Sequence, residues 1–437
     1  MHFTYKELTN ITQAQELNHK KNNTDKYTIS TDTRTIKNGD IYLPLKGESF
    51  DGEKFIEEAI KKGAVGYFTT KKQIHDNAFA LLVENTQNAY LQLAHAYKEK
   101  INPTTVAITG SSGKTTTKEI FSAIFEANRR THKSKLNHNN EIGLCQTLLS
   151  MKEDTEVLIV EMGMRGLGEI ELLSKYAQPD YAVITNIGTA HIGRLGSREN
   201  IARAKCEIIK HLKNNGTLIT LEDELYEDAL KNFDKTHKVI SSKEFKINKM
   251  SQNYSEFIYK NNTYNMNVGG EYNILDALLA IETALLYGLT PDEIQKGLSN
   301  YSPIEKRFEE TVIDNLTIIN DSYNANPDSM KVAIKAFIDL YKGEKILVLA
   351  DMKELGENEV EYHKEIGKYL DSFNDITIFT VGELAKNISN STSHTSKHFC
   401  DNIDVANELK NIKKETKIFL KGSNSMNLYK IIEEIKK

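Results

Sequence analysis

Short apolar runs alternate with helical stretches through the middle of the chain. The runs are residues 104–110, 157–163, 181–188 and 216–220. A helix is predicted from Lys114, because apolar side chains recur at helical spacing after it. These are Ile120, Phe121, Ile124 and Phe125. Strands that alternate with helices are typical of a parallel sheet with helices on both faces, so we predict an α/β domain here.

The last third of the chain repeats this alternation. Its apolar runs are residues 316–320, 345–351, 376–382 and 416–422. Helices are predicted near His363, at the C-terminus and from Pro327, where Asn326 is a good cap and Asp328 places an acid in the first turn. The pattern predicts a second doubly wound, Rossmann-like domain.

The first hundred residues carry a weaker pattern. Ile41, Leu43 and Leu45 alternate with other residues, which predicts a half-buried strand. Helices are expected around residues 55–62 and 91–100. The 437 residues exceed the roughly 250–300 that one core organises. We therefore predict an α/β protein of three domains: a small N-terminal domain (1–100), a central parallel-sheet domain with a phosphate loop (101–306) and a Rossmann-like domain (307–437).

Residues 244–268 differ from the rest of the central domain. They are rich in Asn and Tyr and alternate in polarity, which favours a small antiparallel insert. A long apolar helix follows and ends at Gly288, and Asn273 is the cap expected at its start. The next helix should begin at Pro291, with Thr290 and Glu293 forming a capping box.

Composition narrows the function classes. The 56 basic and 61 acidic residues give a net charge of −5, which excludes a chain-wide basic surface for nucleic acid but not a local basic cleft. The three cysteines are widely spaced and do not look like a disulfide framework. The sequence shows no secretory signal, no apolar run of the roughly 18 residues that span a membrane and no coiled-coil seam. We expect a cytoplasmic monomer.

The strongest chemical signal lies between the strand at 104–109 and the helix from Lys114. Residues 110–115 read GSSGKT, a short phosphate loop in which backbone N–H groups converge on phosphate oxygens at a helix N-terminus. Lys114 supplies a charge for the β- and γ-phosphates, and the Thr115 hydroxyl suits Mg²⁺. The general phosphate-loop motif is longer, G-x-x-x-x-G-K-[ST], and Ile108 stands at the position of its first glycine. The alternative interpretation is therefore a Ser/Gly turn that caps a helix and has an incidental lysine.

Two strand ends next to this loop carry candidate metal ligands. Glu161 ends the run at 157–161, where a Mg²⁺ ligand belongs in an open α/β sheet. His191 follows the run at 181–188 in a similar place. A solvated carboxylate and a structural histidine are the alternatives for these two positions.

Lys205 lies on the apolar side of a helical stretch. It comes four residues after Ile201 and three before Ile208, where lysine is rare unless paired. Burial lowers an amine's pKa and favours its neutral form, which can add CO₂ to give a metal-binding carbamate. A lysine that extends its amine from the helix edge into water is the alternative.

Further polar residues are candidates for substrate contact. Asn137, Asn139 and Asn140 form a cluster that is otherwise typical of a turn. Arg165 and Arg194 are suited to bidentate binding of carboxylates, with a plain surface position as the alternative.

These motifs resemble, as a set, those of the Mur ligase family. The resemblance rests on TGSSGKTTTKE (109–119), NHNNEIGL (137–144), EMGMRGLGEI (161–170), ITNIGTAHI (184–192) and NDSYNANPDSM (320–330). It extends over nearly the whole chain, from DTRTIKNGD near the start to KGSNSM near the end. The motifs are most similar to the branch that adds D-alanyl-D-alanine to a UDP-N-acetylmuramoyl-tripeptide.

The resemblance implies roles for particular residues. It implies ATP and Mg²⁺ (two ions) as cofactors, with Thr115, Glu161, His191 and a carbamate on Lys205 as the metal ligands, and Lys114, Lys205, His191 and Glu161 as the catalytic set. The implied ATP-binding residues are Gly110, Ser111, Ser112, Gly113, Lys114, Thr115, Thr116, Asn273, Arg307 and Asp321. The implied substrate-binding residues are Thr31, Thr33, Arg34, Lys46, Gly47, Asn137, Asn139, Asn140, Arg165, Tyr323, Asn324 and Asn326.

Four positions depart from the family pattern. Tyr272 and Asp276 stand in the adenine-side motif, Glu53 replaces the histidine of an Asp-Gly-His segment, and Asn424 replaces an arginine near the C-terminus. These departures leave open which groups make the corresponding contacts.

The implied activity is ATP-driven amide formation through an acyl phosphate, as a step of peptidoglycan precursor synthesis. A sister Mur ligase that adds a diamino acid and a folylpolyglutamate synthase are the nearest alternatives. A phosphate-loop switch without ligase chemistry is the alternative from another class, but it needs no buried Lys205 and no third nucleotide-facing domain. The sequence does not distinguish lysine from diaminopimelate as the third residue of the tripeptide.

Overall fold

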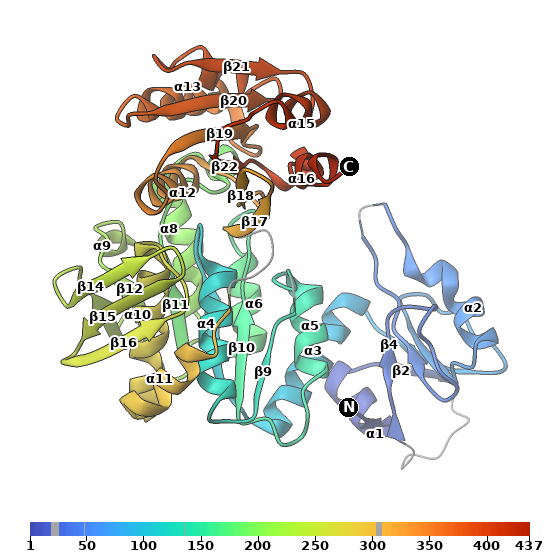
Figure 1. Ribbon diagram of the computed structural model, residues 1–437. Helices are drawn as coiled ribbons and strands as arrows, with labels where there is room; N and C mark the ends of the chain where they lie inside the picture. The colour runs from blue at the N-terminus through green and yellow to red at the C-terminus, as the bar shows by residue number, and fades with distance from the viewer. Residues whose placement is uncertain (19–25, 48, 136, 303–307) are drawn as a thin grey trace.

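The computed structural model describes residues 1–18, 26–47, 49–135, 137–302 and 308–437. Three sheets, each flanked by helices, follow one another along the chain, with the N-terminal sheet beside the central one and the C-terminal sheet above it (Figure 1). The predicted α/β fold class is confirmed. Within the described residues, no helix is long and apolar enough to cross a bilayer.

The N-terminal region folds into a five-stranded sheet in the order β2-β7-β6-β5-β4, beside a short β1-β3 pair. Its elements are β1 (Phe3–Thr4), α1 (Tyr5–Thr12), β2 (Gln15–Asn18), β3 (Lys26–Tyr27), β4 (Ile29–Ser30), β5 (Ile41–Tyr42), the 3-10 helix η1 (Gly52–Phe55), α2 (Ile56–Lys61), β6 (Gly66–Thr69), β7 (Phe79–Leu82) and α3 (Thr86–Ile101). Strands β4 to β7 are parallel, and β2 runs antiparallel at one edge.

The strand predicted over residues 41–45 is confirmed only at Ile41–Tyr42, and its predicted half-burial is wrong. Strand β5 has only two residues, and Ile41, Tyr42 and Leu43 are all buried. Ile41 packs in one apolar core and Tyr42 in another, because both faces of this sheet are covered. The polar face that the alternation suggested does not exist.

The central sheet has six parallel strands in the order β13-β12-β11-β8-β10-β9. Its elements are β8 (Thr104–Thr109), α4 (Lys114–Glu126), β9 (Thr131–Lys133), α5 (Glu141–Leu149), β10 (Val157–Glu161), α6 (Glu169–Ala177), β11 (Tyr181–Ile184), α7 (Ile192–Leu195), α8 (Arg198–Cys206), η2 (Glu207–Ile209), β12 (Thr217–Leu221), α9 (Tyr226–Ala229) and β13 (Thr236–Ile240). Because β11, β8 and β10 are neighbours, the segments that follow them meet at one edge of the sheet.

The predicted antiparallel insert is confirmed. It consists of β14 (Phe245–Ser251), β15 (Tyr254–Tyr259) and β16 (Asn262–Met266), followed by α10 (Glu271–Tyr287) and α11 (Pro291–Ser299). The capping box of Thr290 and Glu293 forms as expected. Helix α10 ends at Gly288, but it begins at Glu271 with Gly270 at the cap, so the expected cap at Asn273 is wrong.

The C-terminal sheet has the order β17-β18-β22-β19-β20-β21 and is parallel except for β17. Its elements are β17 (Glu309–Ile313), β18 (Leu316–Asn320), α12 (Pro327–Leu340), β19 (Glu344–Ala350), η3 (Gly356–Asn358), α13 (Glu359–Leu370), β20 (Ile376–Val381), α14 (Lys386–Ser389), β21 (Ser396–Phe399), α15 (Asn402–Lys410), β22 (Thr416–Lys421), η4 (Asn424–Met426) and α16 (Tyr429–Ile435). Asn326 caps α12 as expected.

Helix α3 joins the first two sheets. It packs against α5 and α6 of the central region (Figure 1). Leu91 and Leu93 on α3 belong to the same apolar core as Leu144 and Leu148 on α5. Because the boundary is a shared core, the N-terminal sheet is fixed to the central one by burial of apolar surface.

Candidate active site

The phosphate loop lies between β8 and α4 and depends on two glycines. Gly110 (φ 153°) and Gly113 (φ 77°) have backbone angles that favour glycine. A Cβ on Gly110 would lie 1.8 Å from Oγ1 of Thr185, and a Cβ on Gly113 would lie 2.7 Å from Oδ1 of Asp276. Other groups therefore pack directly onto the loop backbone, and no larger residue fits.

The segment after β11 braces this loop. The N–H of Ser112 donates to Oδ1 of Asn186 (3.1 Å), and the N–H of Ser111 donates to the Asn186 carbonyl (3.1 Å). The Lys114 amine donates to the carbonyl of Gly110 (2.8 Å), so it lies back over the loop. Asn186 is a site residue that sequence reasoning missed, although its place at the end of the neighbouring parallel strand was a usable signal.

Glu161 is buried at the end of β10, with 3% of its surface exposed. Its Oε1 accepts a hydrogen bond from the amide of Asn139 (3.0 Å). Its Oε2 is buried and accepts no hydrogen bond from any described residue, and the Lys118 amine is 4.0 Å away. A buried carboxylate oxygen without a hydrogen bond fits a Mg²⁺ ligand.

Lys205 is buried as predicted, with 2% of its surface exposed. Burial, reinforced by the positive charge of Lys114, lowers the pKa of the Lys205 amine well below its usual value. Burial also lowers the pKa of His191, Glu354 opposes this effect, and Lys114 and Lys205 reinforce it. The structure thus brings Lys114, His191 and Lys205 within electrostatic reach of one another.

No three His, Cys, Asp or Glu side chains gather into a metal site within the described ranges. Glu161 and His191 are the two candidates of those types, and Thr115 is the second residue of α4, next to the phosphate loop. Few protein ligands are typical of Mg²⁺, which keeps waters and substrate phosphates in its shell. The residues present fit such an ion.

The polar cluster before α5 divides into different local roles. Asn140 caps α5 by accepting from the N–H of Gly143 (2.9 Å). The carbonyl of Asn137 accepts from the N–H of Asn139, whose side chain reaches Glu161. Arg165 is exposed, and its N–H donates to Glu169. Of this group, the structure places Asn139 at the candidate metal ligand.

The start of α10 faces the phosphate loop. The amide of Asn273 donates to the carbonyl of Gly269 (2.6 Å), which holds the turn before the helix. Asp276, one turn further on, places its carboxylate against Gly113. A carboxylate at this point adds negative charge where an anion would bind.

The crevice of the C-terminal sheet contains an ion pair whose lysine is buried and whose aspartate is partly exposed. Asp321, just after β18, lies 2.6 Å from the amine of Lys421 at the end of β22. The Lys421 amine also donates to the carbonyl of Asn324 (3.2 Å). Tyr323 is exposed in the same loop, at 37%. Arg307, expected to bind nucleotide, lies outside the described residues.

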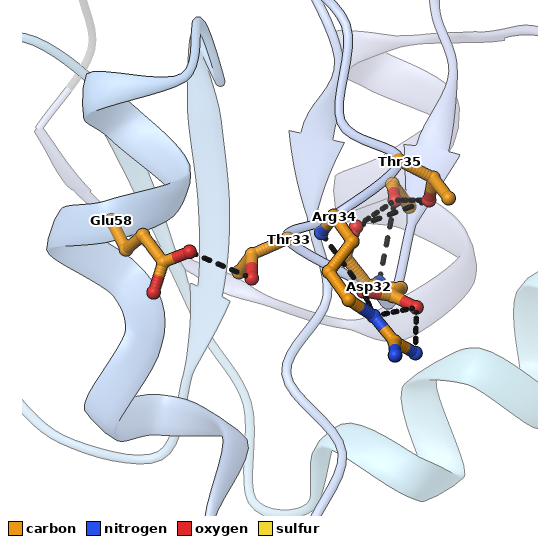
Figure 2. Close-up of polar contacts among 6 residues, drawn as sticks. Asp32, Thr33, Arg34, Thr35 and Glu58 are labelled. Atoms are coloured by element: carbon orange, nitrogen blue, oxygen red, sulfur yellow. Dashed lines mark hydrogen bonds and ion pairs between the residues drawn. The ribbon is translucent and has the colours of Figure 1, made fainter.

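The first-domain candidates lie on the surface of the N-terminal sheet. Arg34 pairs with Asp32 through hydrogen bonds that hold the pKa of Asp32 at about 2 (Figure 2). Thr33 points the other way and donates to Glu58 (3.2 Å). The Arg34 side chain is 84% exposed. It is therefore accessible to a ligand.

The remaining first-domain candidates make contacts within the N-terminal region and with α3. Thr31 hydrogen-bonds the buried Tyr90. The backbones of Lys46 and Asp51 pair in an isolated antiparallel β-bridge, and the N–H of Gly47 donates to the carbonyl of Phe50 (2.8 Å). Glu53, where the family pattern has histidine, binds Thr70 and the amine of Lys71 (2.9 Å). The carboxylate of Glu53 is therefore already bound to residues of the same domain.

Family models match three consecutive parts of the chain. The Mur ligase family, catalytic domain matches residues 26–102, the Mur ligase middle domain matches 108–284, and the Mur ligase, glutamate ligase domain matches 306–424.

Similar proteins span nearly the full length. UDP-N-acetylmuramoyl-tripeptide–D-alanyl-D-alanine ligase of Bacillus subtilis is 38% identical, covering 99% of this chain and 98% of its own. The Haemophilus influenzae ligase of the same name is 32% identical, with 98% and 97% covered. A crystal structure of MurF from Acinetobacter baumannii is similar with a TM-score of 0.92 at 27% identity, covering 100% and 99% of the two chains. The crystal structure of MurF ligase from Thermotoga maritima in complex with ADP has a TM-score of 0.85 at 28% identity. The match covers 94% of this chain and 97% of that chain.

Proposed function

Because the chain belongs to the Mur ligase family, we propose that it joins D-alanyl-D-alanine to UDP-N-acetylmuramoyl-tripeptide and converts ATP to ADP and phosphate. The observation that carries this proposal is the end-to-end match to ligases of that name, which includes all three sheets and the phosphate loop. The product is a precursor of peptidoglycan, which links the enzyme to cell wall synthesis, cell shape and cell division.

The reaction forms an amide in two steps. The terminal carboxylate of the tripeptide attacks the γ-phosphorus of ATP and displaces ADP, which gives an acyl phosphate. The amine of the dipeptide then attacks the acyl carbon, loses a proton, and phosphate leaves. The protein contributes positioning and charge stabilisation. Lys114 and the loop N–H groups bind the phosphates. For this, the N–H of Ser112 must leave Oδ1 of Asn186 and donate to a phosphate oxygen instead.

The metal site is proposed at the edge shared by β10, β8 and β11. Thr115, Glu161 and His191 would hold Mg²⁺, with Lys205 beside them. Bound Mg²⁺ reduces the repulsion between the carboxylate and the triphosphate. Two ions are proposed because two anionic groups, the substrate carboxylate and the triphosphate, must approach each other. Asn139 orients Glu161 through the 3.0 Å hydrogen bond to Oε1 and leaves Oε2 for the ion.

A carbamate on Lys205 is part of the proposal. The buried amine with a lowered pKa is nucleophilic, and its addition to CO₂ gives a carbamate and one proton. Carbon-13 NMR of native protein in labelled bicarbonate tests this. A carbamate signal in the wild type that Lys205→Met removes supports the modification, and a wild-type spectrum without that signal would reject it.

Other residues receive roles by region. Gly110, Ser111, Ser112, Gly113, Thr116, Asn273, Arg307 and Asp321 are proposed for ATP. Thr31, Thr33, Arg34, Lys46 and Gly47 are proposed for the UDP part, Asn137, Asn139, Asn140 and Arg165 for the muramoyl peptide, and Tyr323, Asn324 and Asn326 for the incoming dipeptide. We propose domain boundaries at 100 and 306, and we propose that the protein is a monomer. We also propose a cytoplasmic location, because ATP and UDP-linked precursors are cytoplasmic compounds.

Phosphate release, measured with each substrate omitted in turn, tests the proposal. Release should require ATP, the UDP-linked tripeptide and the dipeptide together. Release that needs no dipeptide would contradict it and favour a nucleotide switch. Release with a diamino acid or with glutamate in place of the dipeptide would favour the sister ligase or the folylpolyglutamate synthase. Solved folylpolyglutamate synthases share only the fold, with a TM-score of 0.62 at 16% identity.

A further inference from the structure

Two carboxylates of the C-terminal domain bind the loop that carries His191. We call residues 188–193, between β11 and the start of α7, the contact loop. Oδ2 of Asp328 accepts hydrogen bonds from both the N–H (2.6 Å) and the hydroxyl (2.7 Å) of Thr189. Asp328 lies in the first turn of α12, so its charge could have served that helix alone. Instead it is directed across the domain boundary.

The second carboxylate contacts His191 itself. Oε2 of Glu354 lies 2.8 Å from Nδ1 of His191. Glu354 has a left-handed backbone (φ 64°), which a residue with a side chain adopts only where its surroundings hold it there. Two bonds hold the preceding residues: the N–H of Met352 donates to Nε2 of His363 (2.9 Å), and the N–H of Lys353 donates to Ser423 (2.9 Å).

Between these carboxylates the two backbones touch. A Cβ on Gly193 would lie 2.3 Å from the N of Gly356, and a Cβ on Gly356 would lie 2.6 Å from Cα of Gly193. Glycine at both positions lets the domains approach closely enough for Asp328 and Glu354 to reach the contact loop.

The other side of the contact loop rests on the phosphate loop. The N–H of Gly188 donates to the hydroxyl of Ser111 (2.8 Å). Asn186, just before it, holds Ser112. The contact loop is therefore the structural link between the C-terminal domain and the residues that bind phosphate.

We propose that Asp328 and Glu354 are positioning residues for the ligase reaction: by binding the contact loop they set His191 against the phosphate loop only when the C-terminal domain is docked. The inference rests on the proposed function for the reaction it serves. The contacts of Asp328 and Glu354 orient an interface that also buries apolar side chains, since Ile192 and Leu195 belong to the same core as Leu355. Interfaces between domains of one chain can open to exchange substrates. The 45% exposed Glu354 is accessible to water and can separate without leaving a buried charge.

Kinetics of four variants provide the first test. Asp328→Ala and Glu354→Ala each remove a docking contact and should lower kcat by about 10–100-fold, as expected for misplaced reacting groups. ATP affinity should change little, because the two side chains bind Thr189 and His191 and not the phosphate loop. Glu354→Gln keeps a side-chain oxygen beside His191 without the charge and should restore most of kcat. Glu357→Gln alters an exposed acid of the same segment and is the matched control.

A distance measurement separates positioning from general destabilisation. Cys400 is exposed in the C-terminal domain, whereas Cys145 and Cys206 are buried. Spin labels on Cys400 and on Lys249→Cys, an exposed site in β14, report the separation of the two domains by electron double resonance. The wild type should give one main distance. The two alanine variants should add a longer one at an unchanged melting temperature.

Two results would overturn the inference. One is an unchanged kcat in both alanine variants. The other is a lowered kcat with the wild-type distance distribution and a lowered melting temperature, which would mean loss of stability alone. If the wild type itself forms no amide with the dipeptide, the proposed function fails, and the distances still decide whether these carboxylates dock the domains.

Discussion

The phosphate loop and the first-domain segment around Arg34 are both proposed to bind phosphate groups, but they are built differently. Each glycine of the phosphate loop lies against another group, and Asn186 binds its Ser111 and Ser112. Arg34 projects into solvent, and its contact with Asp32 spans only two residues of the chain. The first is a preorganised site and the second is an adaptable surface.

Because of this difference, substitutions in the two regions should change different kinetic parameters. A preorganised, partly buried group acts on charge that develops in the transition state, so its loss should appear in kcat. An exposed cation acts mainly on encounter and binding and is screened by salt. The predictions below separate the two regions on this basis.

The largest effect is expected from Lys114→Ala. Removal of the amine should lower kcat by about 10³-fold, in the range seen when one preorganised donor is lost. Phosphate release at saturating substrates measures this effect. A fall in kcat of less than about tenfold would place the γ-phosphate away from this amine.

Lys205→Met should lower activity and raise stability. We expect kcat to fall by about 10²-fold, from loss of an oriented group at the metal site. Because the folded-state pKa of Lys205 lies well below its unfolded value of 10.5, the proton on this amine opposes folding below pH 10.5. The wild type therefore loses stability as pH falls below 10.5, and the methionine variant does not.

Urea unfolding of both proteins at pH 7 and pH 10, in buffers freed of CO₂, measures this difference. At pH 7 the variant should have the higher free energy of unfolding. At pH 10 the difference in free energy of unfolding between the two proteins should be smaller. An equal gap at the two pH values would show that the amine is solvated in the folded state.

Gly113→Ala should destabilise the protein more than Gly168→Ala. The two glycines have similar backbone angles (φ 77° and 84°), so the strain of adding a side chain is alike. At Gly168 the added Cβ would meet no described atom within 4 Å, whereas at Gly113 it would meet Asp276. The difference should be about 1–3 kcal/mol in free energy of unfolding, the cost of overpacking. Equal losses would show that Asp276 moves aside freely and that the loop is less rigid than described.

The smallest effect is expected from Arg34→Ala. It should raise KM for the UDP-linked substrate by about 5–10-fold at low salt, less at high salt, and leave kcat unchanged. Initial rates at two ionic strengths measure this. A fall in kcat instead would give Arg34 the kind of role assigned to Lys114 and remove the contrast between the two regions.

The sequence predicted the features that depend on local pattern. The phosphate loop, the capping box at Thr290, the insert and the burial of Lys205 each follow from spacing within a few residues, and the structure has them. The error at Asn273 has a local cause as well. Gly270, three residues earlier, adopts a positive φ (100°) that glycine tolerates, so the helix begins before Asn273. Edge strands β17 and β21 were missed because they are mostly polar and exposed.

Contacts between distant segments could not be predicted in this way. Asn186 binds a residue 74 positions away, and Asp328 binds one 139 positions away. Nothing in the pattern around Asp328 distinguishes an acid that stabilises its own helix from one that reaches across a domain boundary. Such contacts require the order of strands in the sheets and the placement of the domains, which periodicity does not contain.

The product of the reaction tests the central claim most directly. Purified protein is incubated with ATP, Mg²⁺, the UDP-linked tripeptide and D-alanyl-D-alanine, and the nucleotide-linked product is identified by mass spectrometry. The proposal predicts one new compound, in which the tripeptide has gained the dipeptide with loss of one water, formed in step with ADP. ADP formed without that compound, or the same compound formed equally well by Lys114→Ala, would contradict it.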